Sequence, residues 1–227
     1  MYIFQRSPIK ALAYSQSTTS TTMSAIFSPP PSFSIQTERL HISYFEPGNP
    51  DHTAFALHLW SFDEITKYIG KRGIVSLERA DEFIRFSVQA DYNRTGYGRF
   101  LVSLKPHPQA SLAESKLIGV VSLLLREPPL GYPCPDIGYA FVPDEWGKGY
   151  ATEAAIALID YALRKFDVKG VFGFCKPDNK RSRRVLEKIG LEFRGEKILR
   201  FFDDGTPSAI YALPGMDSDL SVYGMED

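Results

Sequence analysis

Residues Asp136 to Ala155 read DIGYAFVPDEWGKGYATEAA, and this stretch governs how the rest of the chain is interpreted. It starts as an apolar strand, is interrupted by Pro143, turns through Gly147 and Gly149, and continues as a helical pattern. The first turn of a helix has backbone N–H groups without intrahelical partners, and the helix dipole adds about half a positive charge there. Because glycine lacks a Cβ, a phosphate oxygen can approach this backbone closely. The stretch therefore predicts an anion site, although a Gly-x-Gly pair alone is also explained by a tight turn.

Spacing excludes two other phosphate motifs. A P-loop needs Ser or Thr after its Gly-Lys pair and an earlier Gly, but Gly149 follows Lys148 and Val142 stands at the earlier place. A dinucleotide fingerprint needs a third Gly where Thr152 stands. It also needs an acidic residue at the end of the next strand, whereas Asp167 precedes that strand. Neither a nucleoside triphosphate nor a dinucleotide is indicated.

The pattern P-x-x-W-G-x-G-Y-A-T-E-A over residues 143–154 resembles the acetyl-CoA pyrophosphate loop of the GNAT acetyltransferase superfamily. Its form is similar to the branch that contains the ribosomal-protein N-terminal acetyltransferases RimJ and RimL. The general loop has Arg or Gln, two residues, Gly, one residue, and Gly or Ala; here Trp146, Gly149 and Ala151 stand at those places, so Trp146 departs from it. The segments TERL at 37–40, N-x-x-S at 179–182 and EKIGL at 187–191 are also similar to the family, so the resemblance covers about four-fifths of the chain.

The resemblance implies one α/β (α+β) domain over residues 33–213. Its sheet is expected to be mixed and mostly antiparallel, with about six to seven strands, helices at its sides, and a splay between the fourth and fifth strands. Periodicity predicts strands at 40–45, 99–105, 116–125, 136–142, 168–174, 192–202 and 209–213. Helices are predicted over 51–69 in two pieces, after a Ser76 cap, after Gly149, and after Asn179 up to Gly190. The helix after Gly149 has an apolar stripe that includes Ile156 and Leu163, predicted as core.

The two ends of the chain differ in composition from its middle. Residues 1–32 are rich in Ser, Thr and Pro, which predicts a disordered tail. Arg6 and Lys10 in this acid-free start also resemble a weak mitochondrial transit peptide, and Met23 is an alternative start of translation. Residues 214–227 are predicted to form a flexible C-terminal tail.

The composition of the chain argues against several classes of protein. The formal net charge of −1 gives no support for a nucleic-acid partner, and no apolar run reaches the roughly 20 residues of a membrane span. Cys134 and Cys175 are too few for a disulfide scaffold, and the four histidines are scattered without metal-ligand spacing. A Gly-x-Ser-x-Gly nucleophile elbow is absent. We expect a cytoplasmic monomer or homodimer without a metal, with a mitochondrial location as the alternative.

Acetyl-CoA is the co-substrate that the resemblance implies. The expected cofactor contacts are Phe141, Val142, Trp146, Gly147, Lys148, Gly149, Tyr150, Ala151, Thr152, Asn179 and Ser182. Backbone N–H groups at Phe141 and Val142 would polarise the thioester carbonyl, and Asn179 would hydrogen-bond the pantetheine arm. Asn179 is equally explained as a helix N-cap.

Catalytic groups are less well defined by the sequence. Many family members place a tyrosine seven residues after the Asn to protonate the leaving thiolate, but Leu186 stands there. Ser182 is then the candidate general acid, with a water as the alternative. Asp136 is the first candidate base and Glu127 the second; each is also explained as a solvated loop acid. The basic start of the last helix, Lys180 to Arg184, either attracts the cofactor phosphates or is a solvated face.

Three functions stay open at this stage. The chain is an acetyl-CoA-dependent acyltransferase that acetylates a protein or peptide N-terminus, or one that acetylates a small-molecule amine, or a CoA-binding module without turnover. An α-amine with a pKa near 8 costs only about 1.4 kcal/mol to deprotonate at pH 7, against about 4.6 kcal/mol for a lysine. The demand on a general base is therefore milder for N-termini and weakly basic amines.

Overall fold

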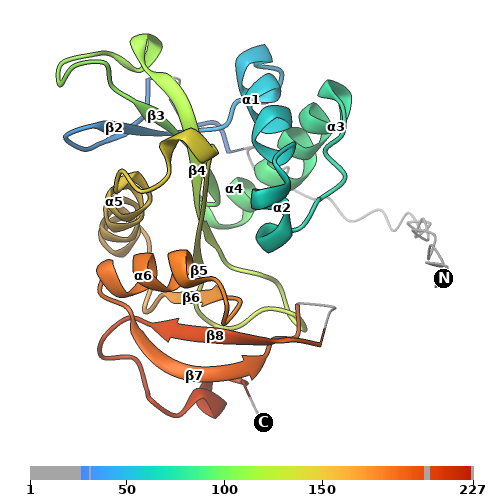
Figure 1. The fold of residues 1–227 in the computed structure, drawn as a ribbon, viewed down its shortest axis with the longest axis vertical. Coiled ribbons are helices and arrows are strands. Elements are labelled where there is room, and N and C mark those ends of the chain that lie inside the picture. The colour runs from blue at the N-terminus through green and yellow to red at the C-terminus, as the bar shows by residue number, and fades with distance from the viewer. Residues whose placement is uncertain (1–26, 31, 202–204, 226–227) are drawn as a thin grey trace, which may run out of the picture.

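Eight strands form one sheet in the computed structural model, which describes residues 27–30, 32–201 and 205–225 (Figure 1). The strand order is β1-β2-β3-β4-β5-β6-β8-β7, and every neighbouring pair is antiparallel except β5 and β6. The bounds are β1 Ile35–Gln36, β2 Leu40–Tyr44, β3 Arg99–Leu104, β4 Lys116–Leu124, β5 Asp136–Phe141, β6 Phe172–Cys175, β7 Glu192–Ile198 and β8 Pro207–Ala212. The mixed, mostly antiparallel α/β sheet is confirmed. The additional strand is β1, which is too short to give an alternation signal in the sequence.

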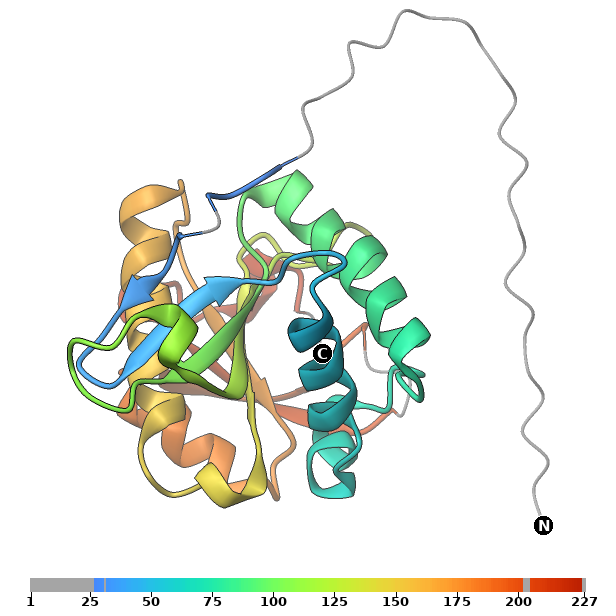
Figure 2. The ribbon, with the colours of Figure 1, turned by 90° about the horizontal axis from the view of Figure 1, so that it is seen from above.

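Helices cover both faces of this sheet. One face carries α1 Pro50–Trp60, α2 Asp63–Ile69, α3 Leu77–Glu82, the π-helix η1 Phe83–Val88 and α4 Gln89–Thr95. The long helix α5 Tyr150–Lys165 lies on the opposite face, as Figure 2 shows from above, and α6 Lys180–Lys188 packs beside β6. Short 3₁₀ turns complete the order: η2 Leu112–Glu114, η3 Pro143–Glu145 and η4 Leu220–Tyr223. Ser76 caps α3 as predicted, because its side chain accepts a hydrogen bond from the Arg79 N–H.

Helix α5 packs its alanine-rich face on the sheet. Its buried residues are Ala154, Ala155, Leu158, Ile159 and Ala162. The prediction that Ile156 and Leu163 belong to the core was wrong, since they are 41% and 43% exposed. Small side chains along the buried face let the helix lie close to strands β4 and β5.

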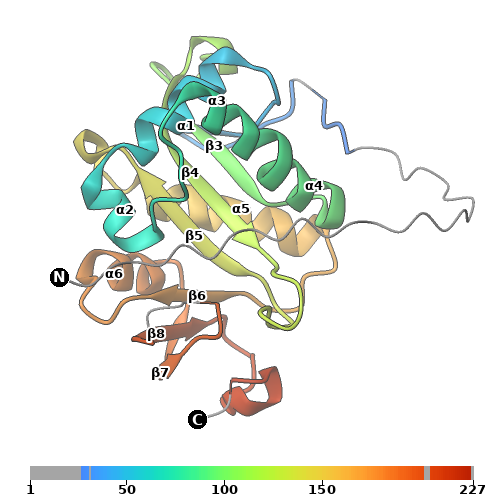
Figure 3. The ribbon, with the colours of Figure 1, turned by 90° about the vertical axis from the view of Figure 1, so that its right-hand side faces the viewer.

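The sheet splits between β5 and β6, as the resemblance implied for its fourth and fifth predicted strands. These parallel strands pair only at Asp136 with Phe172 and at Ile137 with Gly173. Beyond that point β5 continues to Phe141 and β6 to Cys175 without further pairing. Figure 3 shows β3, β4 and β5 as one group, with β6, β8 and β7 below it. The split leaves one edge of β5 open toward α6.

Residues after β8 pack against a second, smaller cluster. Leu220 and Met225 are buried there with Phe172, Leu199 and Ile210. Part of the predicted tail of residues 214–227 therefore has buried side chains, and its flexibility stays a prediction. The suggested transit peptide lies outside the described residues.

Candidate active site

The open edge of β5 presents backbone N–H groups to the split. The Val142 N–H donates to the Ile118 carbonyl of β4 at 3.0 Å. Because hydrogen-bonded pairs alternate in an antiparallel ladder, the N–H groups of Tyr139 and Phe141 point to the other side, toward the split. Of the two donors expected from the sequence, Phe141 is placed to reach a ligand in the split, whereas Val142 is already engaged. Tyr139 is a further donor of this kind, and sequence reasoning missed it.

The Gly-rich loop after β5 ends at the N-terminus of α5. Gly147 and Gly149 have φ of 78° and 85°, which is the left-handed region that disfavours other residues. Gly149 is the N-cap of α5 and offers no side chain to its first turn. The N–H groups of Tyr150, Ala151 and Thr152 therefore open α5 without a side-chain cap, at the end of a 16-residue helix whose dipole favours an anion.

Two residues of the TERL segment hold this loop in place. The carboxylate of Glu153, in the first turn of α5, accepts hydrogen bonds from the Thr37 hydroxyl at 2.5 Å and from the Arg39 N–H at 3.1 Å. The Arg39 guanidinium pairs with the same carboxylate at 2.6 Å, donates to the Lys148 carbonyl at 3.0 Å, and lies over the Tyr150 ring. Burial acts to raise the pKa of Glu153, but the bonds from Thr37 and Arg39 outweigh it and the pKa is lowered. We call Thr37, Arg39 and Glu153 the loop brace.

Because the loop brace supports the cofactor loop, we expect substitutions in it to weaken the binding of acetyl-CoA and to leave the acetyl-transfer step nearly unchanged. Glu153→Gln is expected to raise the KM for acetyl-CoA about fivefold and to leave kcat nearly unchanged, since a half-exposed pair contributes about 1 kcal/mol. In a double-mutant cycle, the loss of acetyl-CoA binding in the Glu153→Gln, Arg39→Gln double variant should be smaller than the sum of the two single losses by about 1 kcal/mol. Arg79→Gln, which breaks the exposed pair with Glu82 on α3, is the matched control. Additive effects, or a lowered kcat with an unchanged KM, would contradict the brace.

A pocket of about 360 Å³ opens beside the loop. It is lined by Trp146, Asp178, Asn179, Lys180, Arg181 and three residues of α2, Glu64, Lys67 and Tyr68. The Trp146 indole N–H donates to the Phe141 carbonyl at 2.6 Å, and the Arg181 guanidinium lies 4.7 Å from the centre of its ring. Trp146 thus ties the loop to β5, in place of the Arg or Gln of the general pattern.

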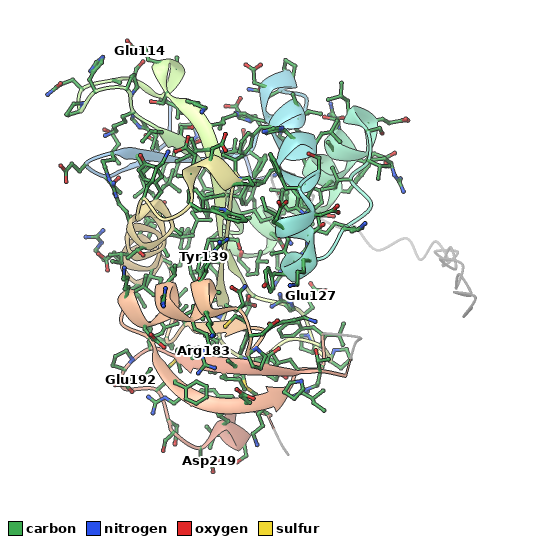
Figure 4. All side chains as sticks on the ribbon, in the orientation of Figure 1. Glu114, Glu127, Tyr139, Arg183, Glu192 and Asp219 are labelled. Carbon is green, nitrogen blue, oxygen red and sulfur yellow. The ribbon has the colours of Figure 1, made fainter. Side chains whose placement is uncertain are left out.

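The basic side chains at the start of α6 contact two different parts of the molecule. Lys180 and Arg181 line the pocket, whereas Arg183 donates to the Tyr211 hydroxyl at 3.1 Å on β8 (Figure 4). Lys148 is also turned away, since its ammonium contacts the Glu145 carboxylate at 2.8 Å. A phosphate in the pocket beside Trp146 would therefore meet Lys180 and Arg181.

Asn179 and Ser182 meet at the start of α6, next to Tyr139. The Asn179 side chain accepts from the Ser182 N–H at 3.1 Å, so it is the N-cap of α6. The Tyr139 hydroxyl lies 2.9 Å from the Ser182 Oγ and donates to the Ser182 carbonyl at the same distance. Burial raises the pKa of the Tyr139 phenol, so it stays protonated at neutral pH. Leu186, where many relatives have a tyrosine, is buried in the core.

The two candidate bases have different surroundings. Asp136 is 13% exposed and pairs with the Arg126 guanidinium, whereas Glu127 is 73% exposed and lies 3.6 Å from Arg94. Burial raises the pKa of the Asp136 carboxyl above its ordinary value, although the guanidinium groups of Arg126, Arg99 and Arg72 oppose the shift. A desolvated carboxylate with a raised pKa is the better general base. The Asp136 side chain lies on the same face of β5 as Gly138, next to the split.

Two further features bear on the class of protein. Among residues 27–30, 32–201 and 205–225, no group of three or more His, Cys, Asp or Glu side chains is arranged to hold a metal ion. Within the same ranges, none of the helices is both long and apolar enough to cross a bilayer.

Comparison with known proteins identifies the family of the chain. Residues 39–192 match the family described as acetyltransferase (GNAT) domain. Among relatives, the uncharacterized N-acetyltransferase YnaD of Bacillus subtilis is 38% identical over 60 residues, which is 26% of this chain and 35% of YnaD. The match thus spans about a third of that relative.

Solved structures show the same fold over most of the chain. An acetyltransferase of the GNAT family from Bacillus anthracis has a TM-score of 0.62 and 26% identity, covering 80% of this chain and 98% of that protein. RimL, a ribosomal L7/L12 α-N-protein acetyltransferase solved in complex with coenzyme A, has a TM-score of 0.60 and 18% identity, covering 78% and 94%. The likeness to RimL concerns the fold.

Proposed function

The chain belongs to the GNAT acetyltransferase domain family, and on that premise we propose that it moves an acetyl group from acetyl-CoA to a primary amine by direct attack on the thioester. Membership of this family makes it an acetyl-CoA-dependent acyltransferase. The proposal concerns the acceptor, which is a protein or peptide N-terminus or a small-molecule amine, and the residues that act on it. The observation that supports it is the split between β5 and β6, because the unpaired N–H groups of β5, the uncapped N-terminus of α5 and the Tyr139–Ser182 pair all belong to elements that border β5.

In this proposal each group has a defined task. The N–H groups that open α5 hold the pyrophosphate, and the pantetheine arm lies along the open edge of β5 near Asn179. The Phe141 and Tyr139 N–H groups stabilise the oxyanion that forms on the thioester carbonyl. Asp136 accepts the proton of the attacking amine and later releases it to solvent. Ser182 gives its hydroxyl proton to the departing thiolate and regains a proton from solvent, and the Tyr139 hydroxyl orients the Ser182 side chain.

The experiment that tests the proposal is release of free CoA thiol from acetyl-CoA. The acceptors are N-terminal peptides, arylalkylamines and polyamines, and the product is identified by mass. Thiol release that depends on an amine supports the transferase and identifies the acceptor class. Tight binding of CoA with no release for any acceptor would overturn it in favour of a CoA-binding module without turnover.

The proton donor has its own test. If Ser182 protonates the thiolate, Ser182→Ala should lower kcat about 100-fold, the lower end for a general acid, with little change in affinity for CoA. Tyr139→Phe should lower kcat less, since it removes only the hydroxyl partner of Ser182. Steady-state kinetics and CoA titration measure both effects. Ser115→Ala, at a half-buried serine beside η2 whose hydroxyl donates to the Ser111 carbonyl, is the control. A change in kcat below about threefold for Ser182→Ala would assign the proton transfer to water instead.

A further inference from the structure

A cluster of charged side chains lies on the face of the sheet opposite α5, beside Asp136. Arg99 pairs with Asp91 of α4 at 2.5 Å, and Arg126 pairs with Asp136. Arg72 lies in the turn between α2 and α3. Burial and the like charges of Arg99 and Arg126 lower the pKa of its guanidinium, while Asp91 and Asp136 act to raise it. We call Arg72, Asp91, Arg99, Arg126 and Asp136 the arginine cluster. It contains three guanidinium groups and two carboxylates. Arg94, which pairs with Asp91 at 3.3 Å, and Glu127, which lies 3.6 Å from Arg94, add one charge of each sign, so the excess is one positive charge.

The sheet register places the cluster next to the split. Arg99 of β3 stands opposite Ser122 of β4, and Ser122 stands opposite Gly138 of β5. Two strand spacings separate Arg99 from Gly138, or about 10 Å. Gly138 precedes Tyr139, whose N–H points into the split. A group bound at the cluster would therefore lie within the length of a small amine substrate from the thioester.

A buried donor on the far side of Phe83 from Arg99 also lacks an acceptor in the part of the chain that the structure describes. The Trp60 side chain is 6% exposed, and its indole N–H has no hydrogen-bond partner among the described residues. The Trp60 ring packs on Phe83 at 5.4 Å, and the Arg99 guanidinium lies 5.3 Å from the centre of the Phe83 ring. Buried donors are normally satisfied, so an orphan of this kind points to an absent acceptor. Phe83 begins the π-helix η1, a form that occurs often at functional sites.

Arg72 is the member of the cluster best placed to meet a ligand. Residue 72 is accessible to solvent, and within the described residues Arg72 takes part in no ion pair, whereas Arg99 and Arg126 each have a carboxylate partner. Its backbone has φ of 46°, and in the described part of the chain it is the one residue other than glycine with positive φ. Such backbone strain is retained mainly where surrounding structure or function requires it.

We propose that the arginine cluster binds a carboxylate of the acceptor, so that the enzyme acetylates primary amines that carry a carboxylate close to the amine. This rests on the proposed transferase function and specifies its substrate class. The three guanidinium groups supply more donors than the two aspartates can accept, and a carboxylate complements that excess. Polyamines, which carry only positive charge, would be repelled. Two sources share this chemistry: a free amino acid and a peptide with an acidic first residue.

The test compares acceptors with and without the carboxylate, with each rate referred to the concentration of neutral amine. Peptide amides that begin with Asp are compared with those that begin with Asn, and alanine is compared with alaninamide; spermidine is the cationic acceptor. We expect kcat/KM to favour the carboxylate about 10- to 100-fold in at least one pair, and that pair identifies the source. Equal turnover of carboxylate and amide in both pairs, or a preference for spermidine, would overturn this proposal while leaving the transferase function intact. No turnover with any amine would instead overturn the transferase function.

A substitution at Arg72 tests whether the preference for acceptors with a carboxylate depends on the arginine cluster. Arg72→Asn removes the charge and suits the left-handed backbone, because Asn tolerates positive φ. It should reduce the carboxylate preference to within about threefold, through a higher acceptor KM, with an unchanged KM for acetyl-CoA. Lys71→Gln removes the neighbouring exposed charge, which contacts Asp63 at 3.9 Å, and should keep the full preference. Melting curves of both variants report folding. A preference that survives in folded Arg72→Asn would assign the selectivity elsewhere.

Discussion

Replacing Gly149 with Glu is expected to abolish binding of acetyl-CoA and with it all turnover. Gly149 has φ of 85°, where an L-residue is strained by about 1–2 kcal/mol, and a Cβ there would lie 3.4 Å from the Arg39 guanidinium of the loop brace. The added carboxylate would also occupy the anion site and repel the pyrophosphate, with loss of charge-assisted bonds of roughly 1.5–3 kcal/mol each. Together these effects predict a loss in affinity of at least about 100-fold. Calorimetric titration with CoA measures it.

Two controls separate the causes of that loss. Gly149→Ala introduces the strain without the charge and should weaken binding about tenfold. Gly190→Glu introduces the same strain and charge at the C-terminal end of α6, where φ is 86° and no atom lies within 4 Å of the new Cβ, and should retain binding. A Gly149→Glu protein that is folded and binds CoA within tenfold of the parent would remove the loop from the proposed site.

The sequence predicts element boundaries correctly where nearby residues determine them. Pro143, Gly147 and Gly149 end one element and begin the next for reasons within a few residues of each, and the loop and α5 lie where predicted. The strand predicted at 168–174 begins only at Phe172, because pairing with β5 and β8 rather than apolar composition sets its start. Apolar residues of α5 occupy two adjacent faces of the helix, so their periodicity alone does not identify the buried face. Packing against the sheet buries one face and leaves Ile156 and Leu163 exposed on the other.

The site depended on contacts between distant parts of the chain. Arg39 and Glu153 are 114 residues apart, and neither shows the pairing in its local sequence. The Tyr139–Ser182 contact and the arginine cluster likewise join residues from separate strands and helices. The sequence does contain a signal for the loop brace, because the TERL segment and the start of the helix after the loop both resemble one family. The geometry that connects them required the fold.

Asp136→Asn is expected to lower kcat/KM about 100-fold or more, because it removes the carboxylate that we propose as general base. The measurement uses a weakly basic amine as acceptor, so that the amine's own titration lies below the pH range studied. With the parent enzyme, kcat/KM should fall as the pH falls through the raised pKa of Asp136, and the variant should lack this limb. Glu114→Gln, at an exposed acid far from Tyr139 (Figure 4), is the control.

The melting temperature of Asp136→Asn distinguishes two roles of the carboxylate, a general base and a structural partner of Arg126. Because burial raises the pKa of Asp136, its protonated form is favoured by folding, and that contribution is present below the ordinary Asp pKa and lost as the pH rises through the raised value. A neutral Asn should therefore keep the melting temperature of the parent at neutral pH. A fall of more than about 5 °C would show that the ion pair with Arg126 is the main contribution of the carboxylate. Full turnover with an unchanged pH profile would exclude Asp136 as the base and leave Glu127 as the candidate to substitute next.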